Sequence, residues 1–268
     1  MSGHSLTAVA VDGTQAQAVD EGLGMPILVL HGGMGDSGVW SPVTDRLRDR
    51  FRTVRLHRRQ YRLDLPRKVT MPQEVEHVAA IARQLDRPLL VGHSSGAVLA
   101  LEALVADPEL YSGGVLYEPP AVIDEPLGGG SNEIARGVLE EGKPGKAFAI
   151  FLRDMVQMRP ATARLIGALV GMRAELRDRV ERQLDDNDAI NALGVRLDAY
   201  AKLEMPILLV GGDKSPKHLG ERLDALEKVL PHTRRLLMHG QGHNAERSAP
   251  DRLAAAITKH IDEELPPR

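Results

Sequence analysis

A serine between two glycines, in the motif GHSSG at residues 92–96, is the feature of this 268-residue sequence most suited to chemistry. An apolar run at 88–92 precedes the serine, and a stretch of small residues at 95–106 follows it. The motif therefore lies between a predicted buried strand and a predicted helix. A sharp turn of this kind holds a serine exposed and strained. We interpret Ser94 as a candidate nucleophile.

A serine hydroxyl is a weak nucleophile until a base takes its proton. The candidate base is His243, which lies in the motif HGQGHN at 239–244 after the last predicted strand. His239 stands four residues earlier, a spacing at which two histidines on a helix could bind a metal ion. The two glycines between them argue against a helix there. We therefore predict that His243 is a general base, and we predict no metal site.

Two carboxylates compete for the third position of a catalytic triad, in the chain order serine, acid, histidine. Asp213 follows a predicted strand at 206–211 and stands beside Gly212, where it also suits an ordinary turn. Glu118 ends a predicted strand at 114–118, and a charge at the end of a buried apolar strand is costly without a partner. Either carboxylate could orient the imidazole, so both remain candidates.

The loop HGGMG at 31–35 also follows a predicted strand. The backbone N–H groups of Gly33 and Ser95 are predicted to form an oxyanion hole there. Residues 33–38, GMGDSG, also match the dinucleotide-binding fingerprint GxGxxG, which would indicate an NADP-dependent reductase. Two features argue against that alternative: serine and proline at 41–42 predict a late helix start, and a hairpin precedes the supposed first strand.

Composition excludes several other classes of protein. The chain has no cysteine, so disulfides, thiolate metal sites and cysteine nucleophiles are ruled out. The formal charge is -3, from 34 basic and 37 acidic residues, which argues against a nucleic-acid partner. No apolar run approaches the ~20 residues of a membrane helix. The first residues, MSGHSLTAVAVDG, lack the pattern of an export signal, so we expect a cytoplasmic protein without membrane association.

One segment is strongly basic. Residues 51–68 contain seven lysines and arginines and a single acidic residue, Asp64. We interpret this run as a solvated loop. The alternative interpretation is that its arginines recognise a carboxylate or phosphate on the substrate.

The order of the predicted elements indicates an α/β fold. Continuous apolar runs are typical of strands covered on both faces, and here they alternate with helical patterns, which favours a parallel sheet with helices on both sides. Strands are predicted at 26–31, 51–56, 88–92, 114–118, 206–211 and 235–238, after a hairpin around Asp12 and Gly13 within 7–19. Helices are predicted from a capping box at 70–73 to about 85, and at 95–106, 217–230 and 250–265.

A helical insertion interrupts this alternation. Residues 123–200 contain no convincing strand, and they follow Pro119-Pro120. Helical stretches are predicted at 144–158 and 161–184. We predict that 123–200 form a helical cap, or lid, and that residues 1–122 and 201–268 form the core domain.

Taken together, these motifs resemble those of the α/β-hydrolase superfamily, from the first hairpin to the last helix. The resemblance rests on HGG at 31–33, GHSSG at 92–96, the insertion after the sixth strand, and GQGH at 240–243. It implies an eight-stranded, mostly parallel sheet with a cap over the serine. Epoxide hydrolases and haloalkane dehalogenases of this superfamily carry aspartate as the nucleophile, so Ser94 argues against both chemistries.

The resemblance also bears on the acid. Many members read Gly-x-x-Asp-Pro after the seventh strand, whereas here Ser215 stands at the acid position if Gly212 is that glycine. Some dehalogenase-like relatives carry the acid as a glutamate at the end of the sixth strand, which Glu118 matches. Glu118 is therefore the preferred acid, and Asp213 is the alternative.

From these residues we expect a serine hydrolase that cleaves an ester, lactone or thioester of a small hydrophobic substrate through an acyl-enzyme. We expect it to act on a small-molecule substrate as a monomer or homodimer and to need no cofactor. The alternative from another class is a ligand-binding or receptor protein that uses the same fold without turnover.

Overall fold

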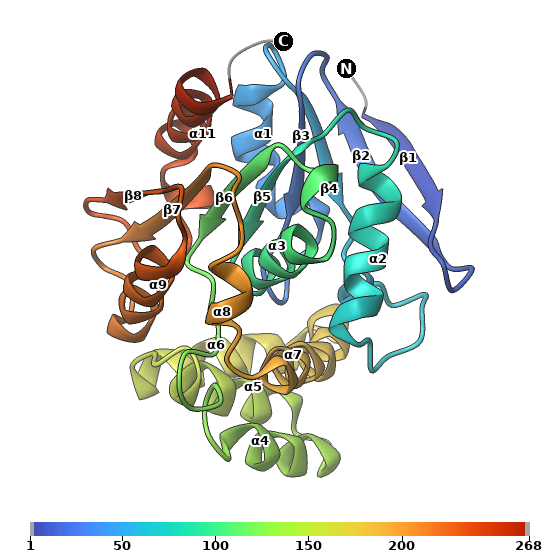
Figure 1. Ribbon diagram of the computed structural model, residues 1–268. Coiled ribbons are helices and arrows are strands. Elements are labelled where there is room, and N and C mark those ends of the chain that lie inside the picture. The colour runs from blue at the N-terminus through green and yellow to red at the C-terminus, as the bar shows by residue number, and fades with distance from the viewer. Residues whose placement is uncertain (1–2, 266–268) are drawn as a thin grey trace.

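Eight strands form a single sheet in the computed structural model, which describes residues 3–265 (Figure 1). Their order across the sheet is β1-β2-β4-β3-β5-β6-β7-β8. β1 and β2 form the antiparallel hairpin, β2 pairs antiparallel with β4, and the other neighbours are parallel. The predicted eight-stranded, mostly parallel sheet is confirmed. The strands are β1 (His4–Val9), β2 (Gln15–Glu21), β3 (Pro26–Leu30), β4 (Arg52–Leu56), β5 (Leu89–His93), β6 (Gly113–Tyr117), β7 (Ile207–Gly212) and β8 (Thr233–Met238).

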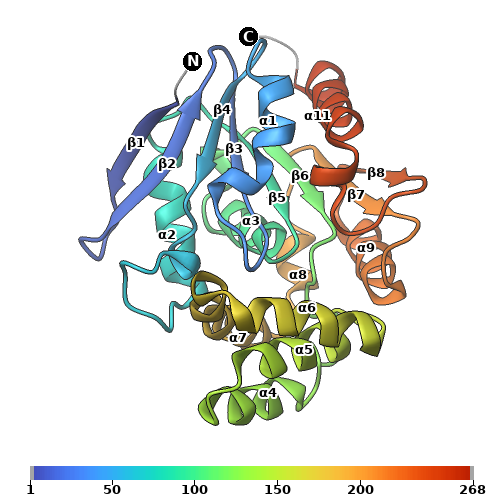
Figure 2. The same ribbon diagram turned by 180° about the vertical axis from the view of Figure 1, so that it is seen from behind.

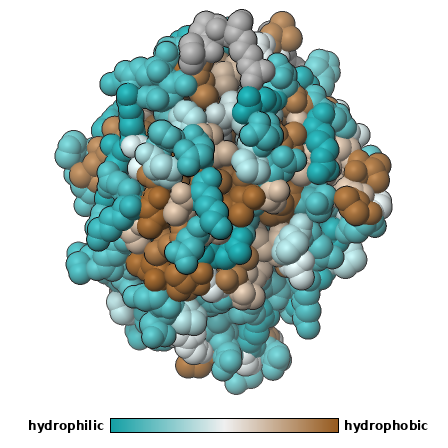
Figure 3. Space-filling view, viewed as in Figure 1, coloured by the Kyte–Doolittle hydropathy of each residue, from teal (hydrophilic) through white to brown (hydrophobic). Residues whose placement is uncertain are grey.

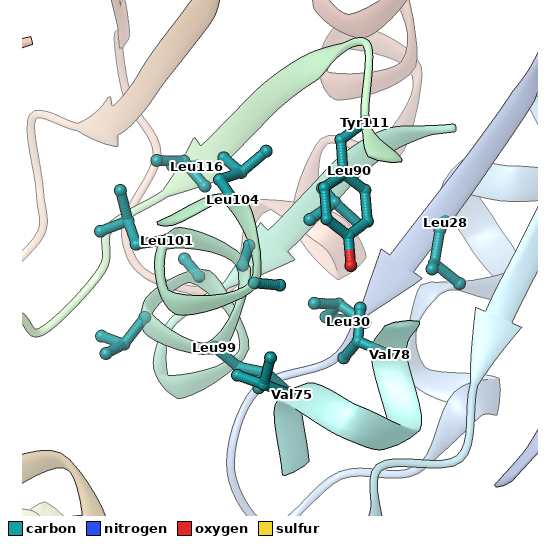
Figure 4. Packing of buried hydrophobic residues seen from close by; sticks show 14 of the residues in the cluster. Leu28, Leu30, Val75, Val78, Leu90, Leu99, Leu101, Leu104, Tyr111 and Leu116 are labelled. Atoms are coloured by element: carbon teal, nitrogen blue, oxygen red, sulfur yellow. The ribbon is translucent and has the colours of Figure 1, made fainter. Parts of the chain in front are cut away.

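Helices cover both faces of this sheet (Figures 1 and 2). Side chains of α2, α3 and α9 share one buried cluster with the strands, and those of α1 and α11 share the other. Figure 4 shows the first cluster, in which Leu30 of β3 lies against Val78 of α2 and beside Leu99 of α3. These helices are α1 (Ser41–Leu47), α2 (Met71–Ala82), α3 (Ser95–Ala106), α9 (Lys217–Val229), α10 (Ala245–Ser248) and α11 (Pro250–Glu264), with short 3-10 turns η1 (Ser37–Trp40), η2 (Arg59–Tyr61) and η3 (Pro108–Leu110).

The central strands are buried along their whole length, which explains their continuous apolar pattern. Every residue of β3, β5 and β6 is buried, because helices pack on both sides of each strand. The capping box predicted at the start of α2 is present, with Gln73 accepting a hydrogen bond of 3.0 Å from the N–H of Thr70. The late helix start predicted after residue 38 is also found, since α1 begins at Ser41.

Between β6 and β7 the chain is helical. The helices there are α4 (Ser131–Glu140), α5 (Pro144–Asp154), α6 (Pro160–Met172), α7 (Ala174–Leu193) and α8 (Leu197–Tyr200). The single helix predicted at 161–184 is wrong, because Arg173 has extended backbone angles (φ -106°, ψ 114°) that separate α6 from α7. Residues of α4 to α7 share a hydrophobic cluster of their own below the sheet, whereas Tyr200 of α8 packs into the main core (Figure 1).

Hydropathy varies across the face of the molecule that Figure 3 shows. Figure 3 shows apolar side chains gathered across the middle of one face, above a mostly hydrophilic lower part formed by the inserted helices. On α6, Leu165, Leu169 and Met172 are exposed. No helix within residues 3–265 combines the length and apolarity required to span a membrane.

Helices α5 and α6 approach each other through glycine. A Cβ atom added to Gly167 of α6 would collide with the carbonyl oxygen of Gly145 in α5 and would lie 2.8 Å from the Cβ of Ala149. Backbone on one side and a rigid methyl on the other leave no room for relaxation.

We expect Gly167→Ala to lower the free energy of unfolding by about 1–3 kcal/mol, because the added methyl overpacks the α5–α6 contact. The matched control is Gly137→Ala in α4, where an added Cβ meets no atom within 4 Å among the described residues. That variant should gain up to about 1 kcal/mol from helix propensity. Urea denaturation measures both, and equal changes in the two variants would contradict this account of the contact.

Candidate active site

Ser94 occupies the sharp turn between β5 and α3. Its backbone has φ 54° and ψ -127°, a strained conformation for a residue with a side chain. A Cβ at Gly92 would lie 2.5 Å from the Cα of Ala97, and one at Gly96 would lie 2.9 Å from the carbonyl carbon of Leu30. Glycine is therefore required on both sides of the serine, because the turn folds back directly onto neighbouring backbone.

The loop after β3 lies against this turn. A Cβ at Gly32 would meet the Cβ of Ser94 at 3.2 Å, and one at Gly33 would overlap the side-chain amide of Gln183 in α7. The ring of His31 donates a hydrogen bond from Nδ1 to the carbonyl of Gly32 at 2.8 Å. Burial and the nearby Arg58 lower the pKa of His31 to about 3, so this ring is neutral at physiological pH. The structure thus places Gly33 and Ser95 on two adjoining backbone segments.

His243 lies in the loop after β8, beside the end of β6. Its Nδ1 is 2.5 Å from Oε2 of Glu118, and Oε1 of Glu118 accepts a hydrogen bond of 2.7 Å from the N–H of Gly212. Glu118 is 1% exposed, so its carboxylate is removed from water and has a partner at each oxygen. Two hydrogen bonds of this kind fix the orientation of the carboxylate and of the imidazole.

Asp213 lies elsewhere. Its carboxylate accepts a hydrogen bond of 2.7 Å from the N–H of Gly240 and lies 3.3 Å from Nδ1 of His239. His239 and Asp213 are both at the surface, with side chains 79% and 35% exposed. The two histidines of the 239–244 loop thus face different carboxylates. No group of three or more metal-binding side chains occurs in the part of the chain that the structure describes.

Two aromatic side chains that the sequence did not single out hold the His243 loop. The ring of His93 stacks on Tyr117 at 5.0 Å, and its Nε2 is 2.8 Å from the carbonyl oxygen of His243. The hydroxyl of Tyr117 donates to the carbonyl of Gly242 and accepts from the N–H of Ala245 at 3.1 Å. Burial and the neighbouring His243 keep the pKa of His93 well below its usual value, so it donates as a neutral ring. Each of these residues directly precedes a predicted site residue in the chain: His93 precedes Ser94, and Tyr117 precedes Glu118.

The basic segment at 51–68 is not a solvated loop, and that prediction is wrong. Several of its arginines are buried, and they are Arg55, Arg58, Arg59 and Arg62. Arg58 is the most deeply buried of them, with a side chain that has no exposed surface. It donates to Ser95 Oγ at 2.8 Å and to the carbonyl oxygen of His31 at 3.1 Å. One guanidinium thus bridges the serine turn and the glycine loop.

The charge of Arg58 is neutralised by two acidic residues. Its Nη2 lies 3.0 Å from Glu74 of α2 and 2.9 Å from Asp186 of α7. Burial alone would lower the pKa of Arg58, but Asp186 and Glu74 outweigh it and raise the pKa. The single hydroxyl proton of Tyr61 is shared between Asp186 at 2.7 Å and Gln183 at 3.0 Å. Burial raises the pKa of Tyr61, so it stays protonated and acts as a donor.

Helix α7 is also tied to the core by surface and backbone contacts. Arg179 donates to the carbonyl of Met34 at 3.2 Å and pairs with Asp36 at 3.1 Å. Arg182 donates to the carbonyl oxygens of Gln60 and Leu65 at 3.1 and 2.8 Å. This helix is therefore anchored to the loop beside Ser94 as well as to the basic segment.

A cavity of about 60 Å³ separates α7 from the serine turn. Ser94, Ser95 and His243 are among its lining residues, so the structure brings the predicted nucleophile and base to the same space. Ligand sites are typically 300–1,000 Å³, so a substrate of more than a few atoms must displace part of the wall. The remaining lining residues are Pro120, Leu127, Phe151, Met155, Val156, Gln183, Asn187, Ile190, His218 and Leu219.

Comparisons with known proteins agree on one family. A family model described as "Alpha/beta hydrolase family" matches residues 27–256. The chain is 28% identical over 253 residues to the 2-(acetamidomethylene)succinate hydrolase of Mesorhizobium japonicum, with 91% of this chain and 90% of the relative covered.

Solved structures show the same fold. An alpha/beta hydrolase from Sphaerobacter thermophilus superposes with a TM-score of 0.80 at 22% identity, covering 96% of this chain and 100% of the other. An esterase from Rhodococcus sp. ECU1013 superposes with a TM-score of 0.73 at 20% identity, covering 98% and 100%. At these identities the likeness concerns the fold.

We expect Arg58→Met to lower the free energy of unfolding by about 3–5 kcal/mol, because it leaves Glu74 and Asp186 buried without a cation. The control is Arg50→Met, whose partner Asp262 is half exposed like Arg50 itself. Removal of such a surface pair should change stability by less than about 1 kcal/mol. Chemical denaturation at neutral pH compares the two, and a loss in Arg58→Met no larger than in the control would contradict the charge arrangement described above.

Proposed function

This chain belongs to the alpha/beta hydrolase family, as its motifs predicted, and from that membership we propose that it is a serine hydrolase of esters, lactones or thioesters. The proposal assigns Ser94 as nucleophile, His243 as base and Glu118 as the acid. It assigns the N–H groups of Gly33 and Ser95 to the oxyanion hole. Ser, His and an acid in this chain order are the arrangement that such a reaction needs on this fold.

The observation that carries the proposal is the hydrogen bond between His243 and Glu118 beside the cavity that contains Ser94. Glu118 accepts a hydrogen bond from Nδ1 of His243, so Nε2 is the nitrogen that can take the serine proton. Asp213 makes its contacts with His239 and Gly240 instead, which favours Glu118 over Asp213 for the role.

In the proposed reaction, the oxygen of Ser94 attacks the substrate carbonyl carbon while Nε2 of His243 takes the hydroxyl proton. The oxyanion that forms accepts hydrogen bonds from the two backbone N–H groups. The bond to the leaving oxygen or sulfur then breaks, and His243 returns the proton to that atom. Water repeats the sequence on the acyl-enzyme, which releases the acid and restores Ser94. Only side chains and backbone N–H groups of this chain, with water, take part, so the proposed reaction needs no cofactor.

The inserted helices complete the proposed site. We infer that residues 123–200 form a cap over a core of residues 1–122 and 201–268, because α5 and α7 supply side chains to the cavity at Ser94. The curated relative is named as a hydrolase of 2-(acetamidomethylene)succinate. That name supports hydrolysis of a small carbonyl compound here, and the acyl group of this chain's own substrate is considered below.

A fluorophosphonate probe tests the assignment of the nucleophile. The wild-type protein should be labelled covalently, and Ser94→Ala should not, because the proposal assigns Ser94 as the nucleophile that His243 activates. Ser41→Ala is the control, since Ser41 is not among the residues that line the cavity and its Oγ donates to the carbonyl oxygen of Gly38, so Ser94 should stay reactive. Labelling that persists in Ser94→Ala would refute the assignment. Tight saturable ligand binding without any turnover would instead favour a binding protein on this fold.

Charge removal at the two candidate acids distinguishes them. We expect Glu118→Gln to lower kcat by about 10⁴-fold, because the neutral amide no longer holds the productive tautomer or stabilises the imidazolium. Asp213→Asn should lower kcat by less than about tenfold, since a surface turn residue of this kind usually alters stability by under about 0.5 kcal/mol.

Both variants are first compared by their melting curves, because Glu118 is buried and also accepts from Gly212. The reverse ranking of the kcat values would move the acid to Asp213. A small loss in both variants would mean that neither carboxylate completes a triad.

A further inference from the structure

The cavity at Ser94 contains polar groups that the proposed chemistry does not use. They come from α7, where Gln183 and Asn187 stand four residues apart and therefore on one face of the helix. Across the cavity from them are Ser94 and His243, and much of the remaining wall is apolar. An uncharged donor placed inside an apolar wall is the usual way in which a pocket fixes the orientation of its ligand.

Asn187 is buried with an unused donor. The residue is 4% exposed, and its Nδ2 has no hydrogen-bond partner among the residues that the structure describes. A buried amide N–H without a partner is destabilising, and in native proteins such groups are rare and call for an explanation. An acceptor brought by the substrate would provide the missing partner.

Gln183 offers a second donor close by. Its Oε1 accepts the hydrogen bond from Tyr61, so the orientation of the amide is fixed and Nε2 is its free end. A Cβ added to Gly33 would lie 3.0 Å from that nitrogen, which puts the amide beside the proposed oxyanion hole. The described residues provide no hydrogen-bond acceptor for Nε2. Both amides therefore belong to residues that line the cavity at Ser94, and each has an N–H group without a partner to offer a substrate acceptor there.

The cavity has no fixed positive charge. No lysine or arginine of residues 3–265 is among its lining residues. His218 is neutral, because burial and Arg222 lower its pKa to about 4. Arg58 contacts Ser95 but is not itself a lining residue, and Glu74 and Asp186 already neutralise its charge. A carboxylate on the acyl group would therefore be buried without a cation, which is strongly unfavourable, whereas a neutral carbonyl oxygen would be satisfied by the amides.

We propose that Asn187 and Gln183 select substrates whose short acyl group carries a second, uncharged carbonyl oxygen a few atoms from the scissile one. This inference rests on the proposed hydrolase function and names the substrate class of that same site. Ser94 and Asn187 line the same cavity of about 60 Å³, so we place the second carbonyl close to the first. The apolar wall then surrounds the carbon chain between them.

Three esters of nearly equal shape test this selection. They are ethyl pentanoate, ethyl 4-oxopentanoate and monoethyl succinate, which end in an alkyl group, a ketone and a carboxylate. Acid release is followed with a pH indicator, and kcat/KM is measured for each. For the wild type we expect ethyl 4-oxopentanoate to exceed ethyl pentanoate by about tenfold, the gain of a buried hydrogen bond. Monoethyl succinate should be the poorest of the three.

The variants separate a hydrogen bond from a general disturbance of the helix. In Asn187→Leu, which has a similar shape, the ratio of ketone to alkyl ester should fall to about one, and Gln183→Met should lower the same ratio. Asn191→Leu is the control: it lies one turn further along α7, where it bonds the backbone of Leu127, and should leave the ratio unchanged. The ratio of the two kcat/KM values does not depend on the amount of folded protein. Partial misfolding of a variant would therefore not lower this ratio.

Several outcomes would overturn the inference. A wild-type ratio near one, an equal fall of the ratio in Asn191→Leu, or monoethyl succinate as the best substrate would each do so, as would no turnover of any of the three esters. Turnover that persists in Ser94→Ala would refute the proposed function itself. Turnover that depends on Ser94 but shows no ketone preference would refute the substrate class alone.

Discussion

Arg58 carries a full positive charge at a place without access to water, and several segments of the chain are held together because they contribute its partners. Glu74 comes from α2, Asp186 from α7, and the two neutral acceptors come from the glycine loop and the serine turn. An ion buried in this way is stable only if every donor is satisfied. The glycine loop, the serine turn, α2 and α7 therefore cannot shift independently of one another. The backbone beside Ser94 is held rigidly as a result.

The His243 loop depends on a different kind of support. It has two glycines and no regular structure, yet its backbone is held at two carbonyls by His93 and Tyr117. These side chains project from the ends of β5 and β6, next to Ser94 and Glu118. Two neighbouring parallel strands thus present the proposed nucleophile and acid and also hold the loop that carries the proposed base. The relative positions of the three residues follow from the pairing of β5 with β6.

Local patterns in the sequence were sufficient for most of the fold and part of the site. Apolar runs and caps identify every strand and the core helices α2, α3, α9 and α11, because those signals depend on neighbouring residues. The partners of Arg58 lie 16 to 128 positions away in the chain, so its burial depends on tertiary packing that no local pattern reports. The same holds for the break at Arg173, which interrupts a pattern that is helical on both sides. Glu118 and Asp213 directly follow two neighbouring parallel strands, β6 and β7. Only the three-dimensional structure shows which histidine each carboxylate contacts.

Helix α7 carries charged and uncharged polar side chains on different faces. Arg182 and Asp186 share a face that meets the basic segment, while Gln183 and Asn187, each one residue further on, are rotated by about 100° and face the cavity. Arg182 and Asp186, which anchor the helix, are thus not among the residues that line the cavity with Ser94. In that space the hydrogen bond between His243 and Glu118 has no lysine or arginine among the described lining residues, and electrostatic interactions are strongest where water and other charges are excluded. The arrangement that fixes the helix is therefore also the one that keeps the reacting end of the cavity responsive to a charge developing on the substrate.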